Sequence, residues 1–211
     1  RIYRIAPDGF KPRQPPQLGK ATTTELVATF EHKNAWHRET ASRLLYERQD
    51  KSAVSLLIKL QQASKSALAR LHALHALDGL GALKETEVLT ALNDADPAVR
   101  EHGIKLSETL FADAVAPAQL WARLRQLADD PDITVRYQLA FTLGEVKGLE
   151  RIAPLAGIAR RDVSDSWTQA AILSALAEGA GEVFSELSQD MGFRESKAGQ
   201  DFLRQLVVLV G

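Results

Sequence analysis

Apolar residues recur at helical spacing from Thr22 to the end of the chain, in short runs separated by turn signals. Phrases such as Asp96-Pro97 predict helix starts, and Gly79 and Gly81 predict a helix end. The connecting turns are short, so neighbouring helices should be antiparallel. The pattern predicts five to six helical hairpins, the last of them the least regular, with the ranges 22–32 and 35–48, 51–61 and 65–78, 84–93 and 97–110, 117–128 and 133–144, 150–160 and 165–178, and 181–190 and 198–210.

An arginine recurs near the start of the second helix of successive hairpins. Arg38, Arg70, Arg100 and Arg136 are separated by 32, 30 and 36 residues, and Thr168 stands at the equivalent place 32 residues further on. A small or apolar residue follows each of them three positions later. These residues are Ala41, Ala73, Gly103, Leu139 (with Ala140 next to it) and Ala171. Self-similarity at this period is typical of stacked repeats, so we expect an all-α solenoid of HEAT-like hairpins over residues 22–211.

The phrases DPAVR at 96–100 and DITVR at 132–136, with a looser NAWHR at 34–38, give the repeated residues their expected roles. The aspartate caps the helix, the valine enters the core, and the arginine reaches an aspartate or carbonyl of the neighbouring turn. A ligand clamp is the less favoured alternative. We therefore interpret one set of residues as structural ties between repeats, namely Arg38, Arg70, Arg100, Arg136, Asp96 and Asp132.

The first 21 residues differ from the rest. The alternation of polar and apolar residues over 1–5 predicts a β-strand, Asp8-Gly9 is turn chemistry, and the proline-rich stretch 11–16 predicts a stiff connector. A single strand needs a partner for its backbone groups. We interpret residues 1–21 as the last strand of a preceding β domain followed by a linker, in a segment of a longer protein.

Composition excludes several classes of function. Lysine and arginine number 26 against 27 aspartates and glutamates, a net charge of −1, so a general attraction to nucleic acid or anionic lipid is not expected. The chain has no cysteine, which excludes disulfides, thiolate zinc sites and haem attachment through a CxxCH motif. No apolar run approaches the ~18 residues of a membrane span, so we expect no membrane insertion by this segment.

Two stretches, NAWHRETASRLLYERQD at 34–50 and ARLHALHALDGLGAL at 69–83, resemble the central HEAT region of large exported proteins of planctomycetes and verrucomicrobia. In that family a sorbosone-dehydrogenase-like β-propeller precedes the HEAT repeats, and a haem-binding cytochrome c domain commonly follows. RIYRIAPDG at 1–9 looks like the closing strand of the propeller. The resemblance covers most of residues 1–105 and implies a periplasmic or otherwise exported location. It implies a membrane-associated dehydrogenase or haem-binding protein as the parent, and it places the chemistry of that parent outside this segment.

Three histidines form the main candidate for chemistry. His72 and His75 share a helix face, and stacking of repeats is expected to bring His102 near His72. Such a ridge could contact a haem or a metal ion, which gives an electron-transfer role as the alternative function. However, no carboxylate completes a metal motif, and equivalent residues of stacked repeats lie ~10 Å apart. We therefore predict no metal site and no cofactor in this segment.

The best binding hypothesis is one face of the inner helices. The fifth position after each repeat arginine reads Arg43, His75, Lys105, Phe141 and Leu173, and the second position reads Thr40, His72, His102, Gln138 and Ala170. This face changes from basic to apolar along the array, and solenoids use such ridges for partners, although a solvated face without a partner is the plain alternative. We assign partner binding to Arg43, His72, His75, His102 and Lys105. The three tryptophans, Trp36, Trp121 and Trp167, are expected to be buried against the adjacent repeat.

No group of residues supports catalysis, since no nucleophile elbow, phosphate loop or acid–base pair is present. An enzyme built on HEAT repeats, such as a DNA glycosylase, would need a strongly basic concave surface. The sequence therefore predicts a non-catalytic scaffold that binds protein, either the flanking domains of the same chain or an external protein.

Overall fold

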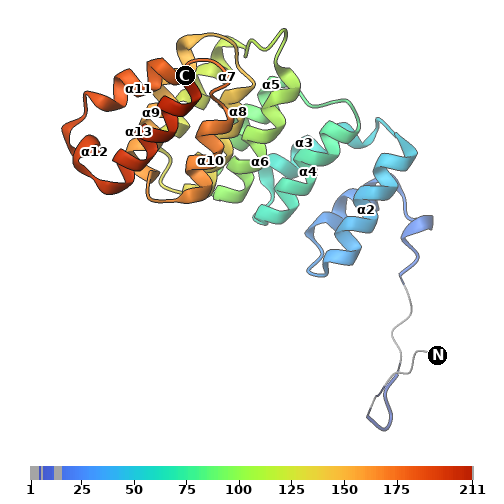
Figure 1. Cartoon of the computed structure of the whole chain (residues 1–211). Coiled ribbons are helices and arrows are strands. Elements are labelled where there is room, and N and C mark those ends of the chain that lie inside the picture. The colour runs from blue at the N-terminus through green and yellow to red at the C-terminus, as the bar shows by residue number, and fades with distance from the viewer. Residues whose placement is uncertain (1–4, 6, 12–15, 211) are drawn as a thin grey trace.

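The computed structural model describes residues 5, 7–11 and 16–210, and over these residues it is a helical solenoid (Figure 1). Its helices form six repeats. They are α1 (Thr23–Ala28) with α2 (Ala35–Arg48), α3 (Ala53–Ala63) with α4 (Ala67–Gly79), α5 (Glu85–Leu92) with α6 (Pro97–Ser107), α7 (Ala118–Gln126) with α8 (Ile133–Gly144), α9 (Ile152–Asp162) with α10 (Ser166–Ser174), and α11 (Ala180–Ser188) with the short α12 (Met191–Glu195) and α13 (Lys197–Val210). The predicted all-α solenoid is confirmed.

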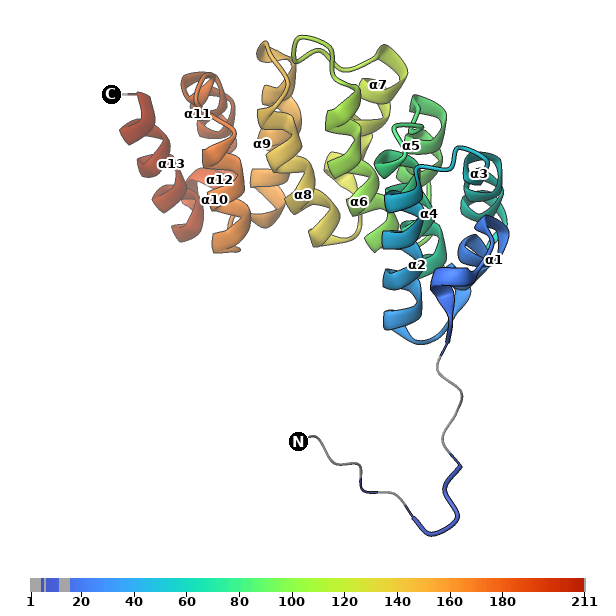
Figure 2. The same cartoon turned by 90° about the vertical axis from the view of Figure 1, so that its right-hand side faces the viewer.

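The repeats stack into an arc, which Figure 2 shows in side view. The second helices α2, α4, α6, α8 and α10 lie on the inner side of the arc, and the first helices α1, α3, α5, α7, α9 and α11 lie on the outer side. Short 3-10 turns extend several first helices, among them η2 (Thr29–Glu31) and η4 (Leu127–Asp129). Residues at equivalent positions of the second helices therefore form rows along the inner surface.

Helix starts follow the capping residues that the sequence supplies. Thr22 and Glu25 form a capping box at α1, with the Thr22 amide donating to Glu25 Oε2 over 2.7 Å. Asp96 caps α6 and Asp132 caps α8 through hydrogen bonds from Ala98 N and Thr134 N. Because these caps satisfy free amides at the helix start, they fix where each second helix begins, within a few residues of the predicted starts.

The hydrophobic core is divided along the chain. One cluster of buried residues, including Phe30, Leu57 and Leu77, belongs to repeats 1 and 2. A larger one, including Leu139 and Phe202, belongs to repeats 3 to 6. A small third cluster of Leu74, Ala91, Val99 and Leu106 fills the junction between α4 and α6. Each repeat contacts mainly its neighbours, as expected of a solenoid.

The small residues of the repeat lie where helices approach closely. Ala41 and Ala73 are fully buried. At Gly103 an added Cβ would lie 3.0 Å from Ala91 Cβ, which is closer than such atoms normally pack. The absence of a side chain at Gly103 therefore lets α6 approach α5.

The long spacing between Arg100 and Arg136 has a local cause. An irregular loop between the 3-10 turn η3 (Glu108–Leu110) and α7 contains an antiparallel bridge between Ala112 and Val115. Asp113 and Ala114 in the middle of this bridge have φ values of 51° and 63°. The loop accounts for the extra residues between the two arginines. It is attached to the next inter-repeat loop, where Lys147 N donates to Ala114 O.

Residues 1–4 of the predicted strand and residues 12–15 of the proline-rich connector lie outside the described residues. Within them, Phe10 N donates to Pro7 O around Gly9, which has a φ of 80°. A 3-10 turn, η1 (Leu18–Lys20), precedes α1. Arg48 at the end of α2 donates to Ala21 O and Gly19 O, so the residues immediately before α1 are attached to the first repeat.

The prediction that the tryptophans are buried is wrong for two of them. Trp36 is 52% exposed and Trp167 is 72% exposed, whereas Trp121 is partly buried. Both exposed residues occupy the second position of an inner helix. At this position the side chain turns toward solvent, and it is the next residue, for example Thr168 with no exposed surface, that enters the core.

Candidate functional site

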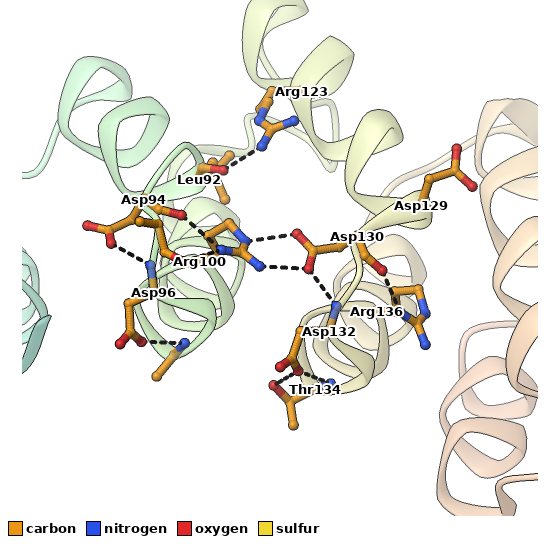
Figure 3. Close-up of polar contacts among 12 residues, drawn as sticks. Leu92, Asp94, Asp96, Arg100, Arg123, Asp129, Asp130, Asp132, Thr134 and Arg136 are labelled. Atoms are coloured by element: carbon orange, nitrogen blue, oxygen red, sulfur yellow. Dashed lines mark hydrogen bonds and ion pairs between the residues drawn. The ribbon is translucent and has the colours of Figure 1, made fainter.

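Three of the four repeat arginines connect adjacent repeats through paired hydrogen bonds. Arg100 of α6 donates from Nε and Nη2 to the two carboxylate oxygens of Asp130, both over 2.8 Å (Figure 3). Arg70 donates in the same way to Asp94 over 2.6 Å. Arg136 donates to Asp162, also over 2.6 Å. A planar guanidinium matches a carboxylate in this bidentate geometry, so each contact fixes orientation as well as distance.

The aspartates join these contacts into a continuous ladder. Asp94 accepts Arg70 at its carboxylate, while its backbone carbonyl accepts Arg100 Nη1 over 2.9 Å. Asp130 likewise accepts Arg100 at its carboxylate and Arg136 Nη1 at its carbonyl (Figure 3). One residue thus binds the arginine before it and the arginine after it. The ladder runs from Arg70 in repeat 2 to Asp162 in repeat 5.

Burial and pairing set the charge state of the ladder. Hydrogen bonding to the partner aspartates raises the pKa of Arg70, Arg100 and Arg136 above the ordinary value. Burial opposes ionisation of Asp94, but hydrogen bonds from Arg70 and from the Asp96 amide outweigh it, so the pKa of Asp94 is lowered. The Arg70–Asp94 pair therefore stays ionised through neutral and mildly acidic pH.

The carboxylates that cross between repeats are not the ones the sequence indicated. Asp96 and Asp132 cap helices within their own repeats, and the ladder uses Asp94 and Asp130, which lie two residues before these caps. The Oδ1 atoms of the two ladder aspartates also accept the backbone amides of the capping aspartates over 2.9 Å. The pattern Asp-x-Asp before the second helix could have identified these residues. Its second aspartate caps the helix, and its first aspartate binds the arginine of the preceding repeat.

The fifth repeat is shifted by one residue relative to the sequence alignment. Gln169, not Thr168, occupies the arginine position, because its Nε2 donates to Val163 O six residues earlier, as Arg136 Nη1 does to Asp130 O. Gln169 also lies four residues after its cap, Asp165, the same distance as in the other repeats. The turn before α10 holds one extra residue, and this displaces the register. Ser174 rather than Leu173 is therefore the fifth-position residue here.

The ladder is missing between repeats 1 and 2. Arg38 donates Nη1 to the carbonyls of His32 and Lys33, like its equivalents, but no carboxylate ion pair of Arg38 occurs among the described residues. Its Nε instead faces His72 Nε2 at 3.4 Å. Ser64 stands where Asp94 and Asp130 stand in later repeats, and its side chain accepts Ser66 N over 3.1 Å. A serine is too short to reach the arginine.

The three ridge histidines are engaged in contacts between helices. His75 Nε2 lies 2.8 Å from His102 Nδ1, with the two rings in a T-shaped arrangement. His72 faces Arg38, so the expectation that His102 lies near His72 is wrong: the stacking offset pairs His102 with His75, one turn further along α4. In the part of the chain that the structure describes, no group of three or more histidine, aspartate or glutamate side chains is arranged to hold a metal ion.

The inner face nevertheless differs between its two halves, although Ser174 takes the place of the apolar residue predicted in repeat 5. Arg43 and Lys105 are exposed in the first half, Arg43 pairing with Glu47 over 3.3 Å within α2. In the second half Phe141 is 38% exposed and stacks edge-on with Tyr137. Beside them, between the starts of α8 and α10, lies a groove of about 290 Å³ lined by Ile133, Thr134, Tyr137, Asp165, Trp167 and Thr168.

Comparison with known proteins identifies the fold. No protein-family model matches the chain, and no curated protein matches it. A designed armadillo repeat protein has a similar structure over 90% of this chain and 100% of its own, with a TM-score of 0.53 and 15% identity. An engineered protein from a structural genomics consortium matches 89% of the chain with a TM-score of 0.48 and 16% identity, and a designed armadillo repeat protein in complex with the peptide (KR)4 matches 90% with a TM-score of 0.44 and 14% identity.

The first of these likenesses and the helix pairing define the class: the chain is an α-solenoid with an armadillo-like repeat architecture. None of the helices in the described residues combines the length and apolar character that crossing a bilayer requires.

Proposed function

We propose that this segment is a non-catalytic scaffold that binds protein through the inner face of its arc, without a cofactor of its own. We further propose that it belongs to an exported dehydrogenase or haem-binding protein, between a sorbosone-dehydrogenase-like propeller and a cytochrome c domain. The resemblance of residues 34–50 and 69–83 to such proteins supports this context. The partner is then a flanking domain of the same chain or an external protein.

The exposed apolar groove between α8 and α10 is the observation that carries the proposal. Trp167 and Ile133 leave 72% and 42% of their surface exposed at this groove, and Phe141 lies beside it on α8. Water-exposed aromatic side chains around a concave apolar site are the usual anchors of protein interfaces. Gathered on the inner face, they form a site for an aliphatic or aromatic side chain of a partner.

The basic residues in the first half of the inner face would orient a partner bound at this groove. Lys105 on α6 is exposed and makes no ion pair among the described residues, and Arg43 on α2 is exposed as well. Acidic groups of a partner would be attracted to this side. We therefore expect the bound surface to place apolar groups at α8 and α10 and acidic groups at α2 to α6.

Isothermal titration calorimetry of the segment with the flanking propeller and cytochrome domains tests the proposal. Phe141→Ala/Trp167→Ala should weaken binding by tenfold or more, roughly the effect of losing an interface hot spot. Arg43→Ala/Lys105→Ala should weaken it by a smaller factor that shrinks at high salt. Substitution of His75 is avoided, because its ring contacts His102.

Exposed residues away from the inner face provide the matched controls. Arg125 lies on the outer helix α7, and Leu149 lies in the 3-10 turn η5 (Leu149–Arg151) before α9. Arg125→Ala and Leu149→Ala should leave the affinity unchanged. Equal weakening by these controls would show that binding is not specific to the inner face. No binding to either flanking domain would reduce the segment to a spacer or direct the search to an external partner.

A further inference from the structure

Beyond partner binding, contacts of His72, His75 and His102 join α2, α4 and α6. We propose that mildly acidic pH destabilises repeats 1 and 2, because the contacts among α2, α4 and α6 require neutral histidines. This inference concerns the stability of the arc and does not depend on the proposed partner.

Hydrogen-bond geometry limits the charge that these histidines can carry. Arg38 can only donate hydrogen bonds, so His72 Nε2, which faces its Nε, must be unprotonated. Between His75 Nε2 and His102 Nδ1, 2.8 Å apart, one nitrogen donates and the other accepts, so one of the two rings must be neutral. In this arrangement the three histidines together hold at most one positive charge, whereas in the unfolded chain all three can be protonated.

The charges around His72 make a second positive charge there unfavourable. Burial, followed by the charge of Arg38 on α2, lowers the pKa of His72, and Glu39 on α2 opposes this in part. The ring also packs against Phe30, 5.5 Å away between centroids. His72 is therefore held neutral by an apolar neighbour and a cation at the contact between repeats 1 and 2.

The surroundings of His75 have the same effect. Burial and the adjacent His102 lower the pKa of His75, and Lys105 of α6 acts in the same direction. Asp78, one turn along α4, opposes them. Because the folded pKa lies below the unfolded value of about 6.5, the stabilising contribution is complete above that pH and is lost as the pH falls below it.

The positions of the histidines in the chain confine the expected loss of stability to one end of the molecule. All five histidines of the chain lie at or before position 102. Ion pairs without a histidine hold the junctions from repeat 2 to repeat 5, namely Arg70–Asp94, Arg100–Asp130 and Arg136–Asp162. Among the described residues, only the junction between repeats 1 and 2 lacks such a pair and depends on His72. Repeats 1 and 2 also have a hydrophobic cluster of their own.

Amide hydrogen exchange of the whole chain at pH 7.5 and 5.5, expressed as protection factors, tests this proposal. Two protons excluded from the folded form correspond to a loss of up to about 100-fold in protection per pH unit below 6.5. We expect this loss in α1 to α4 and none in α8 to α10. A loss of equal size in α8 to α10 would overturn the proposal.

Variants separate the ridge histidines from the others. His72→Gln with His75→Gln and His102→Asn keeps polar atoms near the contacting nitrogens and should abolish the pH-dependent loss. His32→Gln/His37→Gln, which changes a stacked pair at the edge of repeat 1, should keep it. Persistence of the loss in the triple variant would contradict the proposal.

A titration of the unmodified chain followed by NMR of the imidazole carbons covers the case in which the triple variant fails to fold. His72 and His75 should titrate below their ordinary pKa. Titration of both at or above it would also overturn the proposal.

Discussion

Asp94 and Asp130 each accept hydrogen bonds from two arginines, one at the carboxylate and one at the backbone carbonyl. Each of them also accepts a hydrogen bond from the backbone amide of the capping aspartate two residues later, Asp96 or Asp132. A single aspartate therefore orders its own turn and contacts the arginines of two adjacent repeats. Buried ion pairs add little net stability by themselves, but breaking one leaves an uncompensated charge. The ladder therefore specifies how repeats stack more than it contributes free energy.

Ser64 gives the clearest prediction at this scale. Ser64→Asp should supply the missing carboxylate for Arg38, whose Nη1 already bonds two carbonyls as in later repeats. Because Glu31 now accepts a hydrogen bond from Ser64, the test is made in a Glu31→Gln background. The free energy of unfolding in urea should rise by about 1 kcal/mol, the usual scale of a charge-assisted hydrogen bond after its desolvation cost.

Ser64→Asn in the same background is the matched control, since it preserves the turn without the charge. It should change the free energy of unfolding by only a few tenths of a kcal/mol, roughly as a neutral surface substitution does. If the aspartate variant is no more stable than the asparagine variant, Arg38 and residue 64 are not equivalent to the later pairs of the ladder.

At the scale of elements, helix α4 separates two parts of the core. Leu77 on one side of α4 belongs to the cluster of repeats 1 and 2, while Leu74 belongs to the small cluster that meets α6. Both are fully buried. Since this junction has the smallest apolar cluster, the stability of the two sides should be only partly coupled.

Two leucine truncations test this coupling. Leu77→Ala and Leu139→Ala both remove a fully buried side chain and should each cost about 2–5 kcal/mol. Amide exchange should accelerate mainly in α1 to α4 for Leu77→Ala and mainly in α6 to α10 for Leu139→Ala. The same uniform loss of protection in both variants would show one cooperative unit in place of two.

For the whole molecule, the amino-acid sequence is sufficient to predict a solenoid and most helix ranges. Helix caps such as Thr22 and Asp96 can be recognised from the local sequence. The regular spacing of the arginines indicates that the hairpins stack as repeats. Contacts across repeats depend on the offset between stacked helices, which no local pattern contains. The pairing of His75 with His102 was mispredicted for that reason, and so was the choice of Asp96 over Asp94 as the crossing residue.

The inner face illustrates the same limit. The basic residues of its first half and Phe141 were predictable, because equivalent positions form a row in any stacked repeat. The groove and the exposure of Trp167 were not, since they depend on the extra residue in the turn before α10, which shifts that helix by one position. The spacing between repeat arginines already varies by several residues. A shift of one residue therefore cannot be recognised from the sequence.

The most direct test of the central claim is a hydrogen-exchange comparison of the solenoid alone and in the presence of the propeller and cytochrome domains that we propose to flank it. If the inner face binds protein, protection should increase in α6, α8 and α10, with the largest change at the start of α10 around Trp167, while α7 and α9 on the outer side stay unchanged. Protection confined to the outer helices, or no change in any helix, would contradict the account.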